Sequence, residues 1–493
     1  MSVGDDHGPH AVLVVGAGLA GLGAVIRLRD HGIDDVVVLE RGDRVGGTWR
    51  DNTYPGAACD IPSLLYSYSF APNPDWSRTY AGGEEILDYV EHLAHSRDLL
   101  RHVRFGSTVE RLSWDDATGT WTAYVSGAAP VRARAVVMAA GPLANASLPD
   151  LPGLADYTGT TMHSARWDHD VDLTGRRVAV IGTGASAVQI VPRLTERVAS
   201  LKVFQRTPGW VLPRLDRSNT PATRAAFRAV PALQQLARSV LFGAQELAAL
   251  GLVWPTPVTT MMEGAARAWL RHEIPDPWMR RQLTPDFRAG CKRMLVSSDY
   301  LAALRADSTK LITWPIARLS PRGIRTADGI EHELDAVVFA TGFDVSRTGT
   351  PFPVLGRGGH TLDERCKAGG HAYRSVTTAG FPNLFFTFGP NSGPGHHSAL
   401  VYVEAQLEHI ATAVGVIVDR NLRRFEVRAD RERAENDELQ RRLAGTTWNS
   451  GCASWYLTPD GHNATMYPGF ATQYVRSTRR VELDDYEMTR SST

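Results

Sequence analysis

The chain has 493 residues, and its 53 basic and 53 acidic side chains give a formal net charge of 0. At about 150 residues per domain, this length predicts two or three domains. The balanced charge argues against a nucleic-acid partner. Hydrophobic residues make up 43% and charged residues 22% of the chain. This composition is typical of a globular protein and excludes a disordered or fibrous one.

The cysteines and the N-terminus bear on the cellular compartment. Cys59, Cys291, Cys366 and Cys452 lie far apart and form no C-x-x-C pair. We therefore expect neither a zinc ribbon nor a local redox disulfide, and this cysteine usage suits a reducing cytosol. The first ten residues, MSVGDDHGPH, have neither the basic nor the apolar region of a secretory signal. Together these features predict a cytoplasmic protein.

The first expected element is a strand, a glycine turn and a helix in AVLVVGAGLAGLGAVIRL, residues 11–28. Its Gly16-x-Gly18-x-x-Gly21 motif is typical of dinucleotide-binding domains, in which the helix N-terminus binds a pyrophosphate. Glu40 ends the next expected strand, 24 residues after Gly16. A carboxylate there accepts hydrogen bonds from an unphosphorylated ribose, which favours FAD.

A similar module follows in RVAVIGTGASAVQIVPRL, residues 177–194. Its turn contains Gly182, Thr183, Gly184, Ser186 and Ala187. Arg206 occupies the place that corresponds to Glu40, and Thr207 follows it. A guanidinium at this place suits a 2′-phosphate, so this module is expected to bind NADPH.

The remaining pattern predicts an α/β fold with two Rossmann-like domains and a helical insertion. Further strands are expected in DVVVLE, ARAVVMAAG, LKVFQR and DAVVFATGF, and late helices in EAQLEHIATAVGVIVDR and RERAENDELQRRL. We expect an FAD-binding domain in two parts, 1–150 and 380–493, the second including the C-terminal tail. The NADP-binding domain is expected at 151–213 and 291–379, with the helical insertion at 214–290.

The most apolar long stretch lies in this insertion, at VPALQQLARSVLFGAQELAALGLVW, residues 230–254. Arg238 and Glu246 interrupt it, whereas a bilayer span needs about 20 nearly uninterrupted apolar residues. Its apolar residues recur at steps of three and four, which predicts an amphipathic helix packed on protein. No membrane span is therefore expected.

Two further segments carry a family resemblance. GGTWRDNTYPGAACD follows the first turn, and YTGTTMHSARWD lies between the modules. Both resemble the fingerprints of class B flavoprotein monooxygenases of the Baeyer–Villiger type. Related amine- and sulfur-oxidising flavin monooxygenases share the Gly-x-x-x-His core but have Phe or Tyr where Trp167 stands. Tyr157 departs from the Phe usual in the family. The resemblance extends from about Val12 to Tyr474 and is weakest in the helical insertion.

The resemblance implies FAD and NADPH as cofactors and assigns residues to them. The flavin site is lined by Gly47, Thr48, Trp49, Asp60 and Tyr66. The linker that couples domain motion to the cofactor contains Gly159, His163 and Trp167, and Ala340-Thr341-Gly342 is similar to a second link. Imidazole titrates near neutrality, so His163 also permits an acid–base reading, but the resemblance favours the hinge.

The segment AGCKRMLVSSDYL is similar to the family stretch that bears the active-site arginine. Carried over by position, Arg293 is catalytic and Lys292 binds NADP. The turn at Pro55-Gly56 is expected to direct Asp60 inward, where it can pair with Arg293.

The implied reaction consumes O2 and a ketone. Reduced flavin reacts with O2 at its C4a carbon, and the resulting peroxide attacks the carbonyl as an anion to give an ester or lactone. Arg293 would favour that anion and stabilise the tetrahedral oxyanion. An N- or S-oxygenating flavin monooxygenase, a pyridine-nucleotide disulfide reductase and a flavin-binding sensor are the alternatives, although the reductase needs two nearby cysteines. We expect no metal site, because His396 and His397 have no acid at ligand spacing, and a monomer or homodimer.

Overall fold

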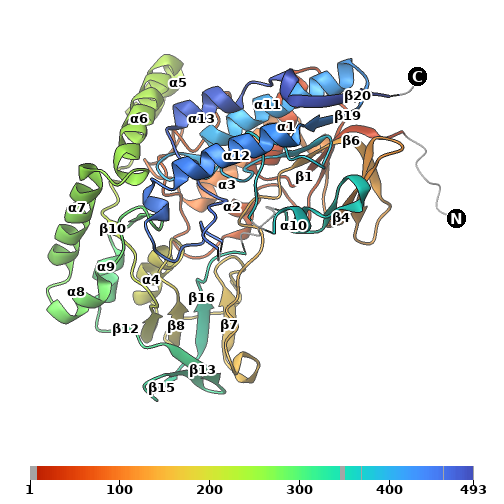
Figure 1. The fold of residues 1–493 in the computed structure, drawn as a ribbon. Helices are drawn as coiled ribbons and strands as arrows, with labels where there is room; N and C mark the ends of the chain where they lie inside the picture. The colour runs from red at the N-terminus through yellow and green to blue at the C-terminus, as the bar shows by residue number, and fades with distance from the viewer. Residues whose placement is uncertain (1–7, 345–349, 368, 459, 492–493) are drawn as a thin grey trace.

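The computed structural model describes residues 8–344, 350–367, 369–458 and 460–491. Most of the MSVGDDHGPH segment, on which the prediction of no secretory signal is based, therefore lies outside the described residues. Within the described ranges the chain forms two large sheets flanked by helices and three smaller sheets, with a set of helices to one side (Figure 1).

The first sheet has eight strands in the order β17-β4-β5-β6-β1-β2-β3, with β18 pairing β6. Its centre is parallel, and the β4–β5–β6 meander is antiparallel. The strands are β1 (His10–Val15), β2 (Val36–Leu39), β3 (Val103–Arg104), β4 (Val109–Asp115), β5 (Thr120–Val125), β6 (Val131–Met138), β17 (Val354–Leu355) and β18 (Leu384–Phe386).

The second sheet has five parallel strands in the order β12-β9-β8-β16-β7. They are β7 (Thr160–His163), β8 (Arg177–Ile181), β9 (Ser200–Phe204), β12 (Thr309–Ile312) and β16 (Ala336–Phe339). Each sheet carries one glycine turn, which leads into α1 (Leu19–Asp30) in the first sheet and α4 (Ala187–Thr195) in the second. The predicted α/β fold with two Rossmann-like domains is confirmed.

The runs of valine explain why these central strands form. All four residues of β2 and of β16 are buried, because helices cover both faces of a parallel sheet. The strands expected in DVVVLE, ARAVVMAAG, LKVFQR and DAVVFATGF are β2, β6, β9 and β16. The smaller antiparallel strands were not predicted: β13 (Ile316–Ser320), β14 (Gly323–Thr326), β15 (Glu331–Glu333), β19 (Leu422–Val427) and β20 (Tyr486–Arg490).

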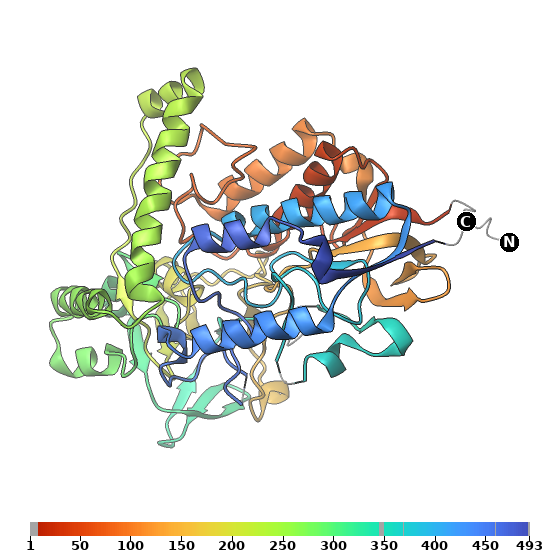
Figure 2. The same ribbon diagram turned by 45° about the horizontal axis from the view of Figure 1, so that its top comes forward.

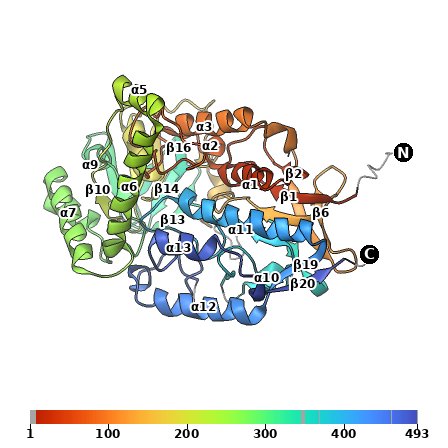
Figure 3. The same ribbon diagram turned by 90° about the horizontal axis from the view of Figure 1, so that it is seen from above.

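The C-terminal part returns to the first sheet. Helix α11 (Ala399–Asp419) lies beside α1, and α12 (Ala429–Leu443) and α13 (Ala471–Thr478) follow it (Figure 3). Among the described residues, α11 is the single helix long and apolar enough to cross a membrane, and 67% of its most apolar window is buried inside the protein. It is therefore a core helix of the first domain. The shorter helices are α2 (Thr48–Asp51), α3 (Gly83–Ser96), α9 (Tyr300–Leu304) and α10 (Leu362–Arg365).

Four helices form the insertion, between the paired short strands β10 (Val211–Leu212) and β11 (Leu295–Val296). They are α5 (Pro221–Ala229), α6 (Pro231–Leu252), α7 (Pro257–Glu273) and α8 (Pro277–Leu283). Each begins with a proline, whose fixed φ and missing N–H suit the first helical position. Side chains of Thr220, Thr256 and Asp276 cap α5, α7 and α8.

One expectation about the insertion is wrong. Helix α6 was expected to pack its apolar side on protein, but Leu236, Val240 and Leu247 are 61%, 64% and 68% exposed. The side turned inward is partly polar: Gln234 donates to the carbonyl of Asn73 (2.7 Å), and Arg238 donates to that of Ser67 (3.0 Å). Periodicity located the two faces of the helix correctly, but the buried face is held by hydrogen bonds.

Candidate active site

The first glycine turn leaves space for a backbone-bound anion. Gly16 has φ +102°, and a Cβ there would lie 2.6 Å from the Ala139 carbonyl oxygen. A Cβ on Gly21 would lie 1.9 Å from the carbonyl oxygen of Gly16, so this position requires glycine for packing. Gly18 precedes α1 and offers no side-chain cap, so N–H groups of the first turn are not bonded by a cap. The turn therefore fits a pyrophosphate.

Glu40 lies at the end of β2 and is 4% exposed. Its carboxylate accepts hydrogen bonds from the backbone N–H groups of Ala17 (2.8 Å) and Gly42 (2.7 Å) and from Arg50 (2.7 Å). Arg50 was not singled out in the sequence, although it stands within the GGTWRDN segment. The carboxylate is thus fixed beside the first turn, where the ribose of a dinucleotide is expected.

The loop after the first turn brings Gly47 against Gly18, where a Cβ on Gly47 would lie 3.1 Å from the Gly18 Cα. Thr48 starts the short helix α2. The Trp49 indole N–H donates to the Tyr66 hydroxyl (3.2 Å), and their rings meet edge to face at 5.6 Å. The structure therefore brings together the residues that the resemblance assigned to the flavin site.

The second glycine turn repeats this arrangement. Gly182 has φ +124°, and a Cβ there would lie 2.3 Å from the Ala340 carbonyl oxygen, whereas a Cβ on Gly184 would meet nothing within 4 Å. Ser186 precedes Ala187 at the start of α4, and its side chain makes no cap hydrogen bond. The Thr183 hydroxyl donates to the carbonyl of Thr207 (2.8 Å) and holds the turn against the segment after β9.

Arg206 and Lys292, the two cations that the sequence assigned to NADP, lie close enough to interact electrostatically. Arg206 is exposed, and no ion pair with a carboxylate is found for it among the described residues. Burial lowers the pKa of Lys292, and the charge of Arg206 lowers it further. Mutual repulsion of this kind needs the two cations to be close, and an anionic ligand would relieve it. The pair therefore suits a phosphate group.

Asp60 and Arg293, 233 residues apart, form a bidentate pair. Nε of Arg293 donates to one carboxylate oxygen and Nη2 to the other, each at 2.7 Å. Burial raises the pKa of Asp60, but the charge and hydrogen bonds of Arg293 outweigh it and hold that pKa below its usual value. The Asp60 charge in turn raises the pKa of Arg293. Both groups are therefore charged at neutral pH.

The Asp60–Arg293 pair joins the two domains and remains partly accessible. Asp60 follows the Pro55-Gly56 turn of the first domain, and Arg293 lies just before β11, where the insertion returns. Their side chains are 27% and 35% exposed. Among the described residues no acceptor is found for Nη1 of Arg293, so this nitrogen is free to bind a ligand.

Two residues around the pair were missed in the sequence. Arg214 donates to the carbonyls of Cys59 (3.1 Å) and Tyr80 (3.2 Å), and its charge helps to lower the pKa of Asp60. Gln189 of α4 accepts from the Tyr54 hydroxyl (2.9 Å) and donates to the Ala58 carbonyl (2.9 Å). No short motif marks either residue, because their partners lie more than 100 positions away.

The C-terminal tail reaches the same region. Tyr456 is 3% exposed, and burial raises its pKa to about 12 while the charge of Arg293 opposes this rise. Cys452, four residues earlier, forms a disulfide with Cys291, two residues before Arg293. This bond is not the local redox disulfide that the sequence excluded, and the sequence did not indicate it, because separation in sequence says nothing about distance in the fold. The bond ties the tail to the segment that carries Arg293.

The two links between the domains run side by side. Ala146 and Phe343 form an antiparallel bridge, and the Thr341 hydroxyl donates to the Ser147 carbonyl (2.5 Å). His163 ends β7, is 5% exposed, and its ring lies edge-on to Phe343 at 6.0 Å. Burial lowers the pKa of His163, which favours the neutral imidazole.

Two other residues of the predicted linker pack locally. Gly159 provides room for the Tyr157 ring, which would lie 2.2 Å from a Cβ, and Tyr157 donates to the Leu334 carbonyl (3.1 Å). Trp167 packs on the core of the second domain, and Ala57 of the first domain's loop packs on the same core.

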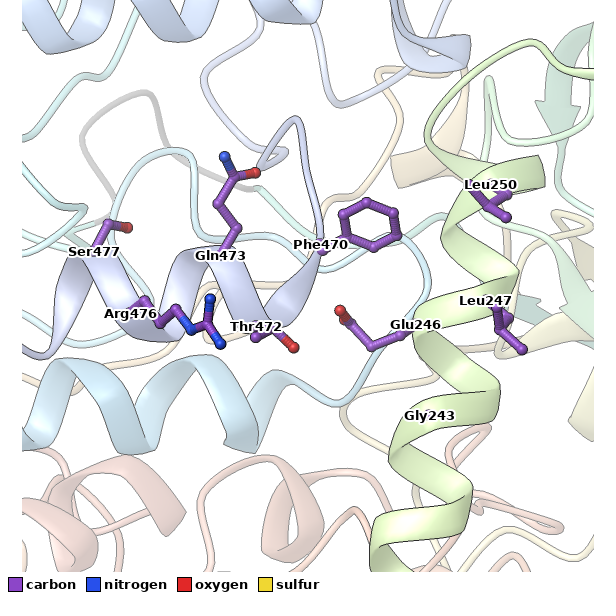
Figure 4. Close-up of a pocket in the computed structure, with 9 residues that line it drawn as sticks. All are labelled: Gly243, Glu246, Leu247, Leu250, Phe470, Thr472, Gln473, Arg476 and Ser477. Atoms are coloured by element: carbon purple, nitrogen blue, oxygen red, sulfur yellow. The ribbon is translucent and has the colours of Figure 1, made fainter.

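An open cavity of about 670 Å³ lies elsewhere, between α6 and α13, and none of its lining residues belongs to the expected site (Figure 4). Glu246 lines it and approaches Nε2 of His396 to 3.6 Å. Glu246 lies far from His396 in the sequence, so the local spacing around His396 did not indicate this acid. Among the described residues, no cluster of three or more His, Cys, Asp or Glu side chains is placed to hold a metal ion.

The fold and the site define a class: enzymes with two dinucleotide-binding domains and a charged pair between them. Comparisons with known proteins identify the family within this class. Residues 10–245 match the family described as FMO-like: Flavin-binding monooxygenase-like. A Baeyer-Villiger monooxygenase of Streptomyces coelicolor is 45% identical over 97% of this chain and 92% of its own length. One of Pseudomonas aeruginosa is 40% identical over 97% and 91%.

Solved structures agree with these relatives. An oxidized steroid monooxygenase bound to NADP matches with a TM-score of 0.87 and 31% identity, covering 98% of this chain and 100% of that one. The chain belongs to the Baeyer–Villiger monooxygenases of the flavin-binding monooxygenase-like family.

Proposed function

We propose that this protein uses FAD, NADPH and O2 to insert one oxygen atom beside a ketone carbonyl, giving an ester or lactone. The single observation that carries the proposal is the bidentate Asp60–Arg293 pair, with a free guanidinium nitrogen, at the junction of the two domains. When bound, FAD reduced by NADPH supplies the activated oxygen for the reaction.

The residues present fit both cofactors. The turn of Gly16, Gly18 and Gly21, with Glu40 beside it, suits the pyrophosphate and ribose of FAD. In the second turn, Gly182 and Gly184 leave space for a second pyrophosphate. We assign the 2′-phosphate of NADPH to Arg206 and Lys292, with Thr207 beside them.

Arg293 is the proposed catalytic residue. Its permanent charge stabilises negative charge on the activated oxygen and on the carbonyl oxygen as it is attacked. Asp60 fixes the guanidinium plane and offsets the cost of its partial burial. An anionic nucleophile attacks a ketone carbonyl, whereas a neutral electrophile oxidises amines and sulfides. The fixed cation therefore favours ester formation over N- or S-oxygenation.

The remaining residues are proposed to position the two domains and to govern access to the site between them. His163, with its burial favouring the neutral ring, is proposed as part of the hinge beside Gly342, together with Gly159 and Trp167. We propose the domain limits at 1–150, 151–213, 214–290, 291–379 and 380–493. The enzyme is proposed to act in the cytoplasm on a small ketone.

Replacing Arg293 tests the proposal. We expect Arg293→Ala to bind FAD and accept electrons from NADPH, but to form ester about 10²–10³ times more slowly, as when a preorganised donor is removed. Arg293→Lys should recover part of the rate, because it restores the charge without the bidentate geometry. A ketone panel read by mass spectrometry for a gain of one oxygen, with NADPH loss recorded alongside, gives both rates. Ester yield unchanged in Arg293→Ala would refute the catalytic role.

A further inference from the structure

The outer side of α6 is apolar along its whole length, and nothing in the described structure covers it. Helix α6 lies at the edge of the molecule (Figure 2). Leu233, Leu236, Val240, Leu247 and Leu250 are 39–68% exposed. The exposed positions of α6 include no charged residue. Solvent-facing apolar surfaces of this extent mark interaction sites.

The spacing of these residues is that of a helix pair. Leu233, Leu236, Val240, Gly243, Leu247 and Leu250 follow one another at steps of 3, 4, 3, 4 and 3. This is the a/d heptad pattern by which two helices interdigitate. The inward side is already used, because Gln234 and Arg238 bond to loops of the first domain and Glu246 accepts from the backbone of Ala471 (2.7 Å). The seam therefore needs a partner outside the described chain.

The pattern is complementary to itself when a second α6 runs antiparallel. The midpoint of Pro231–Leu252 lies between residues 241 and 242. A two-fold axis there would place Leu233 opposite the partner's Leu250, Leu236 opposite the partner's Leu247, and Val240 opposite the partner's Gly243. Large residues meet at both ends, and the valine meets a glycine at the centre, where the helices must approach most closely. A two-fold interface uses the same patch twice in this way.

The cavity between α6 and α13 adds to the fit. Its lining includes Gly243, Leu247 and Leu250 of the seam and Phe470 beside α13 (Figure 4). In the antiparallel pair, the N-terminal half of the partner's helix would lie along this cavity, so its leucines can fill it. A membrane surface is a poorer occupant than a second copy of the chain, because it has no side chains that fill this cavity. Helices that lie on membranes also carry Lys or Arg on their exposed polar side, and α6 has none exposed.

We propose that two copies of this chain form a reversible homodimer through antiparallel pairing of their α6 helices. The seam from Leu233 to Leu250 follows about 26 Å of helix, and a contact along one helix of this length buries less than the roughly 800 Å² per partner of a standard interface. The dimer is therefore expected to dissociate on dilution. The inference does not depend on the proposed reaction.

Sedimentation velocity of the FAD-loaded enzyme over a concentration series tests the dimer. The wild type should shift from monomer to dimer as concentration rises, and Leu236→Glu should stay monomeric. Met261→Glu is the matched control: Met261 of α7 is 72% exposed but lies outside the seam, so this variant should dimerise as the wild type does. Flavin absorbance and unfolding temperature report that each variant is folded.

A mixing experiment tests the antiparallel register. Leu236→Glu and Leu247→Lys should each be monomeric alone and should form a heterodimer when mixed, because position 236 faces the partner's position 247. Mixing Leu236→Glu with Leu250→Lys should recover less dimer. A wild type that is monomeric throughout, a dimer that survives Leu236→Glu, or binding of the monomer to phosphatidylglycerol vesicles that Leu236→Glu abolishes would overturn the proposal.

Discussion

At the residue scale, Arg293 differs from Arg206 and Lys292 in how its positive charge is paired. Arg293 has a bidentate carboxylate partner that fixes its orientation, whereas Arg206 and Lys292 repel each other and only the more weakly acting charge of Asp286 opposes this effect at Lys292. A paired cation keeps its geometry through a reaction, and an unpaired one gains most from an incoming anion. This difference supports a catalytic role for Arg293 and a binding role for Arg206.

The role of Arg206 predicts a specific loss. In Arg206→Ala we expect the KM for NADPH to rise about 10- to 100-fold, as when a charge-assisted hydrogen bond is lost, while the KM for NADH changes little. Steady-state kinetics with both nucleotides measure the ratio. Arg197→Ala, which removes an exposed arginine of the same domain, is the control and should alter neither value. Equal increases for NADPH and NADH would exclude a contact with the 2′-phosphate.

At the element scale, the strand–turn–helix units were predictable because their requirements are local. Gly16 is required by its positive φ and Gly21 by the close approach of the Gly16 carbonyl oxygen, and both requirements follow from the motif. The antiparallel edge strands were missed, since short half-exposed segments have no strong pattern. Helix α6 shows a further limit, because its periodicity defines two faces but does not say which one is buried.

The packing of Gly21 predicts a change in stability. Gly21→Ala would place a Cβ 1.9 Å from the Gly16 carbonyl oxygen, and overpacking of this kind costs roughly 2–3 kcal/mol of unfolding free energy. Gly415→Ala, within α11, meets nothing within 4 Å and should stabilise by about 0.5–1 kcal/mol. Denaturant unfolding of the FAD-loaded protein and its flavin content compare the two. Normal FAD content and stability in Gly21→Ala would contradict the required close approach.

At the scale of the whole molecule, the disulfide and the domain links connect distant segments around the site. The bond between Cys291 and Cys452 closes a loop of 161 residues and holds the tail with Tyr456 beside Arg293. Disulfides are rare in a reducing cytosol. The Cys291–Cys452 bond requires oxidised cysteines, whereas the proposed cytoplasmic location favours reduced ones.

Removing the disulfide tests its contribution. Cys452→Ser should lower the unfolding free energy by about 3 kcal/mol and loosen the tail, because a long loop regains freedom in the unfolded chain. A reductant should produce the same loss in the wild type and none in the variant. Thiol titration of the unfolded, unreduced protein should find only the free Cys59 and Cys366. Four reactive thiols would show that the bond does not form in the purified enzyme.

The sequence by itself determined the two dinucleotide-binding modules, because turns and short fingerprints are local, and it predicted their different preferences and the pairing of Asp60 with Arg293. Only the tertiary structure decided the bidentate contact between those two residues, the support from Arg50, Arg214 and Gln189, the Cys291–Cys452 bond and the outward turn of the apolar side of α6. Each of these depends on segments distant in the chain that meet in space, and no local pattern records which distant partner a side chain will find.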